Sequence, residues 1–227
     1  MTLARGYFLT GTDTDIGKTF AACALLHAWR AQGLRAVGYK PIAAGGEILD
    51  DVLVNDDARK LHAASSSGFT LAQINPVCLR EAIAPHIAAA HEGVHFDFEA
   101  LLSGYQQIAR QVDRVLVEGA GGFCVPLDAA RDTTDMARAF NLPVILVVGM
   151  RLGCLNHALL TIEAIAARGL PLAGWIANTL SPDMPFLAEN IHTLRERIAA
   201  PCLGVLPRFT EAADAAHAAA SLLTLPD

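Results

Sequence analysis

The sequence predicts an α/β fold in which helices flank both faces of a mostly parallel, twisted sheet. Segments with strand character alternate with segments of helical periodicity along the chain. Several strand-like segments, such as residues 114–117 and 144–148, are nearly continuous apolar runs, which is typical of strands covered on both faces. A glycine-containing segment at residues 11–19 joins the first strand to the first helix, as in phosphate-binding loops.

The elements follow one another with short breaks. Strands are expected at residues 5–10, 34–40, 113–118, 143–149, 172–178 and 202–206. Helices are expected, from apolar residues three or four apart, at 18–32, 84–92, 97–112, 155–168, 185–199 and 211–224. Residues 41–80 show neither pattern, so a long loop is expected there, and such loops are usually functional. The chain shows no repeat or linker, and its 227 residues are expected to form a single domain, 1–227.

The composition indicates a soluble protein of a reducing compartment. The formal net charge of −6 disfavours nucleic acid as a partner, because phosphate backbones need a basic surface. The five cysteines are odd in number and widely spread, so free thiols and a cytoplasmic location are expected. The longest strongly apolar run, residues 142–148, is too short to cross a membrane, and no leader precedes the first strand. Neither a membrane partner nor export is expected.

Residues 11–19, Gly-Thr-Asp-Thr-Asp-Ile-Gly-Lys-Thr, carry the strongest functional signal. The glycines permit a tight turn, and the following helix adds unpaired N–H groups and the positive end of its dipole. Lys18 can reach the β- and γ-phosphates, and the Thr19 hydroxyl can bind Mg²⁺. Gly11 and Gly17 are separated by five residues, one more than in the strict Walker A pattern. The segment predicts a nucleoside triphosphate site in a P-loop NTPase-like fold.

Two further polar motifs follow predicted strands. Lys40 ends the second strand; alone it is most often a solvated strand end, but beside a phosphate loop it would stabilise a transferring phosphoryl group. Glu118 follows an apolar strand and opens a glycine-rich turn, as a Walker B carboxylate does when it holds Mg²⁺. A further metal carboxylate is expected from the polar segment after Lys40. Spacing alone leaves three candidates for it: Asp51, Asp56 and Asp57.

Taken together, these motifs resemble those of the dethiobiotin synthetase family. The matching segments, in order and spacing, are residues 11–19, 39–41, 117–122, 152–157 and 177–178. The resemblance runs from the first strand to Pro207 and Glu211, and the long glycine spacing is usual in that family. Each motif alone is common, whereas their combination is specific.

The resemblance implies a reaction. The family converts 7,8-diaminopelargonate, CO₂ and ATP to dethiobiotin, ADP and phosphate. One substrate amine captures CO₂ as a carbamate, the γ-phosphoryl group moves to the carbamate oxygen, and the second amine closes the ureido ring by displacing phosphate. Mg²⁺ accompanies ATP, which is a co-substrate, and no organic cofactor is needed.

The resemblance also implies roles for residues. Lys40, Lys18 and Asp15 are implied to be catalytic, and Thr19, Asp57 and Glu118 to hold Mg²⁺. Asp57 is selected over its neighbours only by alignment to the family. Asn178 is implied to read the adenine edge. The full nucleotide-binding set is Thr14, Asp15, Ile16, Gly17, Lys18, Thr19, Phe20, Glu118, Gly119, Gly121, Asn178, Thr179, Pro207 and Glu211.

The substrate site is implied to be shared between two subunits of a homodimer. In the family, N–H groups at a helix start bind the substrate carboxylate of the neighbouring subunit, a role that a helix N-terminus can physically perform. The implied substrate-binding set is Thr14, Lys40, Ala44, Gly153, Cys154, Leu155 and Asn156. Ala44 departs from the family, which usually has a serine or threonine there. The lost hydrogen bond to a charged group would weaken the site by roughly 1.5–3 kcal/mol.

Two other classes share the nucleotide motifs. A partitioning-type ATPase, acting as a nucleotide-switched dimer, usually has a second lysine early in the phosphate loop, and this loop has none. An amidating synthase of cobalamin biosynthesis carries a further glutaminase domain, for which this chain has no room. A non-enzymatic binding module would not need Lys40 and two carboxylates around the γ-phosphate.

Overall fold

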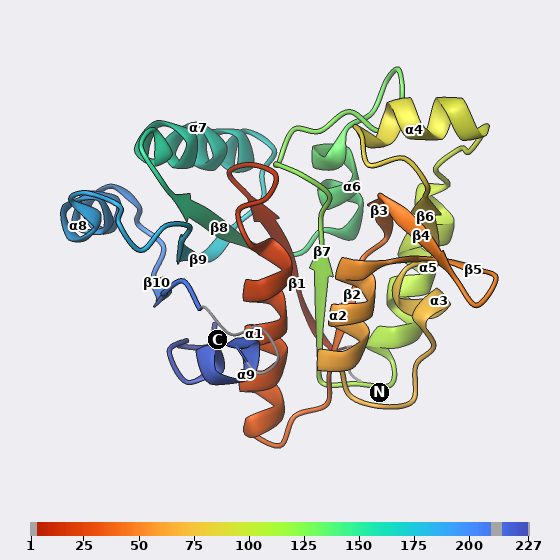
Figure 1. Cartoon of the computed structure of the whole chain (residues 1–227), viewed down its shortest axis with the longest axis horizontal. Helices are drawn as coiled ribbons and strands as arrows, with labels where there is room; N and C mark the ends of the chain where they lie inside the picture. Colours follow the sequence, from red (N-terminus) through yellow and green to blue (C-terminus); the bar gives the residue numbers. More distant parts are fainter. Residues whose placement is uncertain (1–3, 210–214, 227) are drawn as a thin grey trace.

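The computed structural model describes residues 4–209 and 215–226. Its centre is a six-stranded parallel sheet in the order β10-β9-β8-β1-β7-β2 (Figure 1). These strands match the six predicted ones, with ends that differ by at most two residues. Their bounds are Arg5–Gly11 (β1), Ala36–Tyr39 (β2), Arg114–Glu118 (β7), Val144–Met150 (β8), Leu172–Thr179 (β9) and Cys202–Leu206 (β10).

The strand order locates a ligand crevice. β1 lies between β7 and β8, and the chain leaves β1 toward β2 on one side but reaches β8 and β9 on the other. In doubly wound sheets, ligands bind where the connections diverge in this way, at the carboxyl ends of the strands. That edge lies at the top in Figure 1, where β1 turns into α1.

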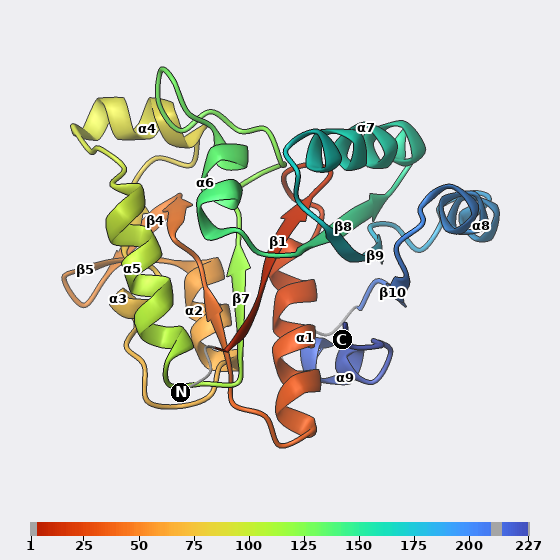
Figure 2. The same ribbon diagram turned by 180° about the vertical axis from the view of Figure 1, so that it is seen from behind.

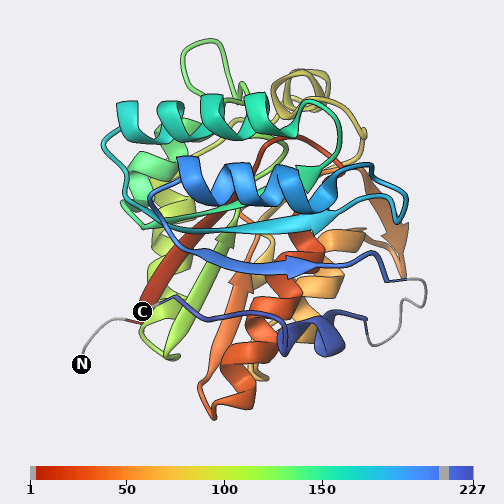
Figure 3. The same ribbon diagram turned by 90° about the vertical axis from the view of Figure 1, so that its left-hand side faces the viewer.

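Helices cover both faces of the sheet, as the sequence predicts. α1 (Lys18–Ala31), α2 (Asp56–Ala64) and α9 (Ala215–Ala220) lie in front in Figure 1. α5 (Phe98–Ala109), α6 (Thr133–Phe140) and α7 (Cys154–Ala167) lie on the other face, seen in Figure 2. α8 (Leu187–Arg197) lies beside α7, as Figure 3 shows from the side.

The hydrophobic core explains why α1 is held so firmly. Most of its side chains are buried, among them Leu25 and Trp29, because the helix lies between the sheet and two other helices. The Trp29 ring stacks on Tyr7 of β1, with ring centroids 5.7 Å apart. The start of α1, which carries the phosphate-loop lysine, is therefore fixed to a rigid body.

The prediction of a long loop over residues 41–80 is wrong. This region contains β3 (Ile42–Ala44), β4 (Gly46–Leu49), β5 (Val52–Asn55), α2, α3 (Leu71–Ile74) and β6 (Val77–Leu79). β4 and β5 form an antiparallel hairpin, and β3 pairs with β6. Because the elements span only three to nine residues, they give no clear periodicity in a sequence window.

The predicted helices are largely confirmed, with two differences. α6 was not expected, although Asp132 and Asp135 form a capping box at its start. The helix expected at 211–224 corresponds to α9, and residues 210–214 lie outside the described part. α4 (Pro85–Glu92) agrees with the expected 84–92. None of the helices in the described part of the chain combines the length and the apolar character needed to cross a membrane.

Candidate active site

A cavity of about 890 Å³ opens at the carboxyl ends of the central strands, beside the start of α1. Its lining includes most of the residues predicted to be catalytic, nucleotide-binding or metal-binding. These are Thr14, Asp15, Gly17, Lys18, Thr19, Phe20, Lys40, Asp57, Glu118, Gly121, Asn178, Thr179 and Pro207. Segments far apart in the sequence therefore meet here because the parallel strands all end at one edge of the sheet.

The phosphate loop connects β1 to α1 through a sharp turn. Gly17 caps α1 in the left-handed region, with φ of 80°, and no side chain caps the helix. A Cβ atom at this position would lie 2.2 Å from Nδ2 of Asn178, so only glycine can occupy it. The same Asn178 amide donates a hydrogen bond of 2.7 Å to the carbonyl of Ile16. The first N–H groups of α1 are thus left for a ligand.

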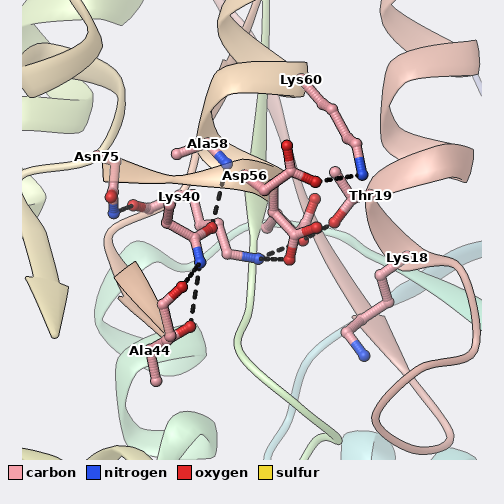
Figure 4. Close-up of polar contacts among 12 residues, drawn as sticks. Lys18, Thr19, Lys40, Ala44, Asp56, Ala58, Lys60 and Asn75 are labelled. Atoms are coloured by element: carbon pink, nitrogen blue, oxygen red, sulfur yellow. Dashed lines mark hydrogen bonds and ion pairs between the residues drawn. The ribbon is translucent and has the colours of Figure 1, made fainter. Parts of the chain in front are cut away.

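Lys40, Glu118, Asp57 and Thr19 form a charged cluster at the base of the cavity (Figure 4). The Lys40 ammonium lies 2.6 Å from Oε1 of Glu118 and 3.1 Å from Oδ2 of Asp57. The Thr19 hydroxyl donates to the same Glu118 oxygen at 2.7 Å. The Glu118 side chain is fully buried, whereas Asp57 is 43% exposed. Two carboxylates therefore flank a buried cation, and one of them also accepts the Thr19 hydroxyl.

The pairing fixes the charge states of this cluster. Burial alone would lower the pKa of Lys40, but the Glu118 and Asp57 carboxylates outweigh it and raise that pKa. Burial alone would raise the pKa of Asp57, but the Lys40 ammonium and the Thr19 hydroxyl bring that pKa below its ordinary value. Lys40 is a permanent cation and Asp57 a permanent anion at neutral pH.

Lys18 has a different environment. Its ammonium donates a hydrogen bond of 2.6 Å to the carbonyl of Asp13 in the phosphate loop. Figure 4 shows it turned away from the cluster around Lys40. Burial lowers the pKa of Lys18 to about 8, despite the nearby Glu118 carboxylate. A bound phosphate would give the Lys18 ammonium the directly paired anion that it does not have in the free protein.

The donor atoms of the cluster suit Mg²⁺. A hydroxyl and carboxylate oxygens are hard ligands, which this ion prefers. Oε2 of Glu118 is buried and has no hydrogen-bond partner among the described residues. A buried carboxylate oxygen without a donor is costly unless a ligand or ion satisfies it. The described residues contain no group of three or more His, Cys, Asp or Glu poised for a metal, so a cation here would need further oxygens, as from phosphates.

Several predicted residues lie outside the cavity lining. Ile16 is fully buried beneath the phosphate loop, and Gly119 packs against the ring of Phe8. The carbonyl of Ala44 accepts a hydrogen bond of 3.0 Å from Nδ2 of Asn55. Glu211 lies outside the described residues.

The predicted substrate-carboxylate segment forms the exposed start of α7. Gly153 caps the helix with φ of 95°, and the Cys154 side chain is buried. Asn156 is exposed, in keeping with a site for a ligand that comes from outside the subunit. The preceding Leu152 is 99% exposed.

The cavity also contains residues that sequence reasoning did not single out. Lys60 lies one turn after Asp56 on α2 and pairs with it at 2.6 Å. The chain has three lysines, and all three line this cavity. Phe209, also not predicted, forms an aromatic pair in the lining with the predicted Phe20, with ring centroids 5.5 Å apart. The small number of lysines could have drawn attention to Lys60 from the sequence alone. The aromatic pair could not be predicted, because its two residues are 189 positions apart.

Comparisons with known proteins agree with this geometry. A family model described as an AAA domain matches residues 5–216. The ATP-dependent dethiobiotin synthetase BioD of Aromatoleum aromaticum is 57% identical over 222 residues, which cover 98% of each chain. The protein of the same name from Cellvibrio japonicus is 52% identical over 224 residues, again 98% of each chain.

Solved structures resemble the fold at much lower identity. The septum site-determining protein MinD from Pyrococcus horikoshii, complexed with Mg-ADP, aligns with a TM-score of 0.59 and 17% identity, over 99% of this chain and 87% of that one. A chain of the MinC:MinD cell division protein complex of Aquifex aeolicus gives a TM-score of 0.55 and 13% identity, over 95% of this chain and 86% of that one. These likenesses establish the fold alone.

The parallel sheet, the phosphate loop and the cavity at its edge define a P-loop nucleotide-binding protein. Within that class, the chain belongs to the ATP-dependent dethiobiotin synthetase family, as full-length identities of 57% and 52% show. The alternative function, a partitioning-type ATPase, is not favoured by these relatives.

Proposed function

We propose that this protein is an ATP-dependent dethiobiotin synthetase. It converts 7,8-diaminopelargonate, CO₂ and ATP to dethiobiotin, ADP and phosphate. The observation that carries the proposal is the pairing of a phosphate loop with a second buried lysine, Lys40, held between Glu118 and Asp57. Two cations beside the γ-phosphate suit transfer of that group rather than mere binding.

The reaction needs positioning and charge stabilisation more than covalent catalysis. One amine of the substrate attacks CO₂ and forms a carbamate. The carbamate oxygen attacks the γ-phosphorus, and the bond to the β–γ bridging oxygen breaks, which releases ADP. The second amine then attacks the carbamic–phosphoric anhydride, expels phosphate and closes the five-membered ureido ring. Protons leave the amines as the two C–N bonds form.

Roles follow from position. Lys18 leaves the Asp13 carbonyl and contacts the β- and γ-phosphates, together with the N–H groups of residues 15–19. Lys40 stabilises the carbamate and the transferring phosphoryl group. Asp15 and Thr14, both exposed on the loop, face the reacting end of the substrate. Asn178, Thr179 and Pro207 receive the adenine, and we extend the same proposal to Glu211.

A magnesium ion would be held by Thr19, Asp57 and Glu118. It would neutralise charge on the phosphate oxygens during transfer. The proposal is supported by the hard oxygen donors and by the unpartnered Oε2 of Glu118. Lys40 pairs with both carboxylates and would share them with the ion, so their negative charge would serve two cations.

The working unit is proposed to be a homodimer. The start of α7, residues 153–156, would bind the substrate carboxylate of the partner subunit through its N–H groups other than that of Cys154, which donates to the Arg151 carbonyl. We further propose that the chain forms one domain and works in the cytoplasm, where its five free cysteines would stay reduced.

The first experiment incubates the purified protein with MgATP, bicarbonate and 7,8-diaminopelargonate and seeks dethiobiotin by mass spectrometry. The expected result is a product that needs all three reactants and disappears in Lys18→Ala. ATP hydrolysis without dethiobiotin would refute the proposal and favour a nucleotide-switch ATPase.

A further inference from the structure

An ion pair joins the phosphate loop to the start of α7. The Arg151 guanidinium pairs with Oδ2 of Asp13, and each side chain is about half exposed. Arg151 begins the connection from β8 to α7, and its carbonyl accepts the N–H of Cys154, the first residue of α7. Asp13 lies in the middle of the phosphate loop, 138 positions away. The pair thus links the proposed nucleotide site to the proposed carboxylate site.

The phosphate loop needs an anchor at this point. Its beginning is fixed by the N–H of Thr12, which donates to Val147 of β8 at 3.0 Å. Its end is fixed by Asn178, which holds the Ile16 carbonyl. Between them, Asp15 has φ of 56°, a left-handed conformation that costs energy for any residue with a Cβ. A strained loop keeps such a conformation only when its surroundings hold it.

Asp13 holds two cations through two different groups. Its side chain accepts the N–H of Thr14 at 2.8 Å and pairs with Arg151. Its backbone carbonyl accepts the Lys18 ammonium. The Thr14 N–H and the Arg151 guanidinium lower the pKa of Asp13, so the carboxylate stays ionised at neutral pH. When Lys18 turns to a phosphate, the pair with Arg151 still holds Asp13.

We propose that Arg151 is a positioning residue, which through Asp13 keeps the phosphate loop in the conformation that receives the nucleotide. The inference rests on the proposed function for the identity of the nucleotide and deepens it. Arg151 acts through Asp13 and touches neither ATP nor the second substrate.

The test compares Arg151→Gln, Asp13→Asn and the double variant. Each single variant is expected to weaken MgADP binding, measured by calorimetry, about three- to fivefold, the loss of one half-exposed ion pair. The KM for ATP should rise by a similar factor, and the double variant should be no weaker than either single one. Arg151→Lys should restore most of the affinity. Melting temperatures should stay close to that of the unmodified protein.

Asp128→Asn is the matched control. Asp128 also accepts N–H groups of following residues and pairs with a half-exposed arginine, Arg131, but it lies outside the cavity lining. This variant should leave nucleotide affinity unchanged.

Two results would overturn the inference. One is wild-type affinity for MgADP in Arg151→Gln. The other is a higher KM for 7,8-diaminopelargonate alone in Arg151→Gln, with Asp13→Asn unaffected, since Arg151 would then contact the substrate itself. Failure of the unmodified protein to make dethiobiotin would instead refute the proposed function, while the MgADP measurement would still decide the role of Arg151.

Discussion

Two lysines 22 positions apart show how one side-chain type acquires two different chemistries. Lys18 is buried near charges without a carboxylate partner of its own, and its pKa falls to about 8. Lys40 is buried between two carboxylates, and its pKa rises. The first lysine is poised to respond to a phosphate, whereas the second is a fixed charge.

Nucleotide affinity should therefore depend on pH through Lys18. Below pH 8 Lys18 is protonated and would bind phosphate. Above pH 8 Lys18 loses this proton in the free protein, whereas a bound phosphate would keep Lys18 protonated. The dissociation constant of MgADP should rise between pH 7 and pH 9, by up to about tenfold per pH unit above 8. Lys18→Arg, which stays charged, should show a flat profile over this range. A flat profile in the unmodified protein would contradict the assignment.

Removing the buried carboxylate should affect both stability and turnover. Glu118→Gln leaves the buried Lys40 ammonium with the half-exposed Asp57 as its remaining carboxylate. We expect a loss of about 3 kcal/mol in the free energy of unfolding and at least about a hundredfold loss of turnover. Urea denaturation and the dethiobiotin assay measure the two effects. Glu163→Gln, at an exposed position on α7, should change neither.

The departure at Ala44 gives a prediction in the opposite direction. Ala44→Ser restores the hydroxyl that the family usually has beside the phosphate and carbamate. A recovered hydrogen bond to a charged group should raise kcat/KM by about tenfold or more. Steady-state kinetics with 7,8-diaminopelargonate measures it, and Ala44→Val, which adds bulk without a donor, should give no gain. An unchanged kcat/KM in Ala44→Ser would mean that another group already makes this contact.

Among single residues, the sequence predicted those that lie in contiguous motifs. Lys18, Thr19 and Glu118 stand in patterns whose spacing reflects one local turn, and the structure brings them within hydrogen-bond distance or into one cavity. Arg151 and Asp13 meet only because β1 and β8 are neighbours in the sheet. Such a pair depends on strand order, which no local pattern encodes.

At the scale of elements, burial decides what a sequence reveals. The six strands of the main sheet were predictable because parallel strands covered on both faces are continuous apolar runs. The short elements of residues 41–80 were not, because hydrogen bonds between neighbours fix them more than their own periodicity. Asn55 is the clearest case. Its Oδ1 caps α2 at the N–H of Ala58, while its Nδ2 binds the carbonyls of Ala44 and Gly45.

Asn55 therefore couples α2, which carries Asp57, to the end of β3, the strand that follows Lys40. Asn55→Ala should cost about 1–2 kcal/mol of stability through the lost cap, and it should also lower turnover. Asn55→Asp keeps a capping oxygen but loses the amide donor, so it should retain more stability yet still lose activity. Asp97→Ala, which removes the cap of α5, is the control: a similar loss of stability with normal turnover per folded molecule. An equal loss of turnover per folded molecule in Asn55→Ala and Asp97→Ala would contradict the coupling.

At the scale of the whole molecule, the sheet order sets the nucleotide cavity apart from the start of α7, whose residues 153–156 are absent from the cavity lining. The proposed site shared across a homodimer would account for this separation. The dimer is inferred only from the resemblance to the family, since neither periodicity nor composition predicts it.

Mixed dimers test the shared site. Lys18→Ala lacks a working phosphate loop, and Asn156→Asp adds a negative charge that repels the substrate carboxylate at the start of α7. If sites are shared, an equal mixture refolded together should regain about a quarter of normal activity at low substrate concentration, since half of the dimers hold one intact site. No recovery, with mixed dimers present by native mass spectrometry, would show that each subunit completes its own site.

The presence of all three lysines in one cavity has a practical consequence for handling this protein. Lysines are usually scattered over a protein surface, but here every lysine that an acylating reagent could modify lines the cavity. Lys60, with 59% of its side chain exposed, should be labelled first, and the doubly paired Lys40 last. Coupling to a resin through lysine would therefore block the cavity. In solution, the extent of lysine labelling would report how much of the protein is occupied by nucleotide.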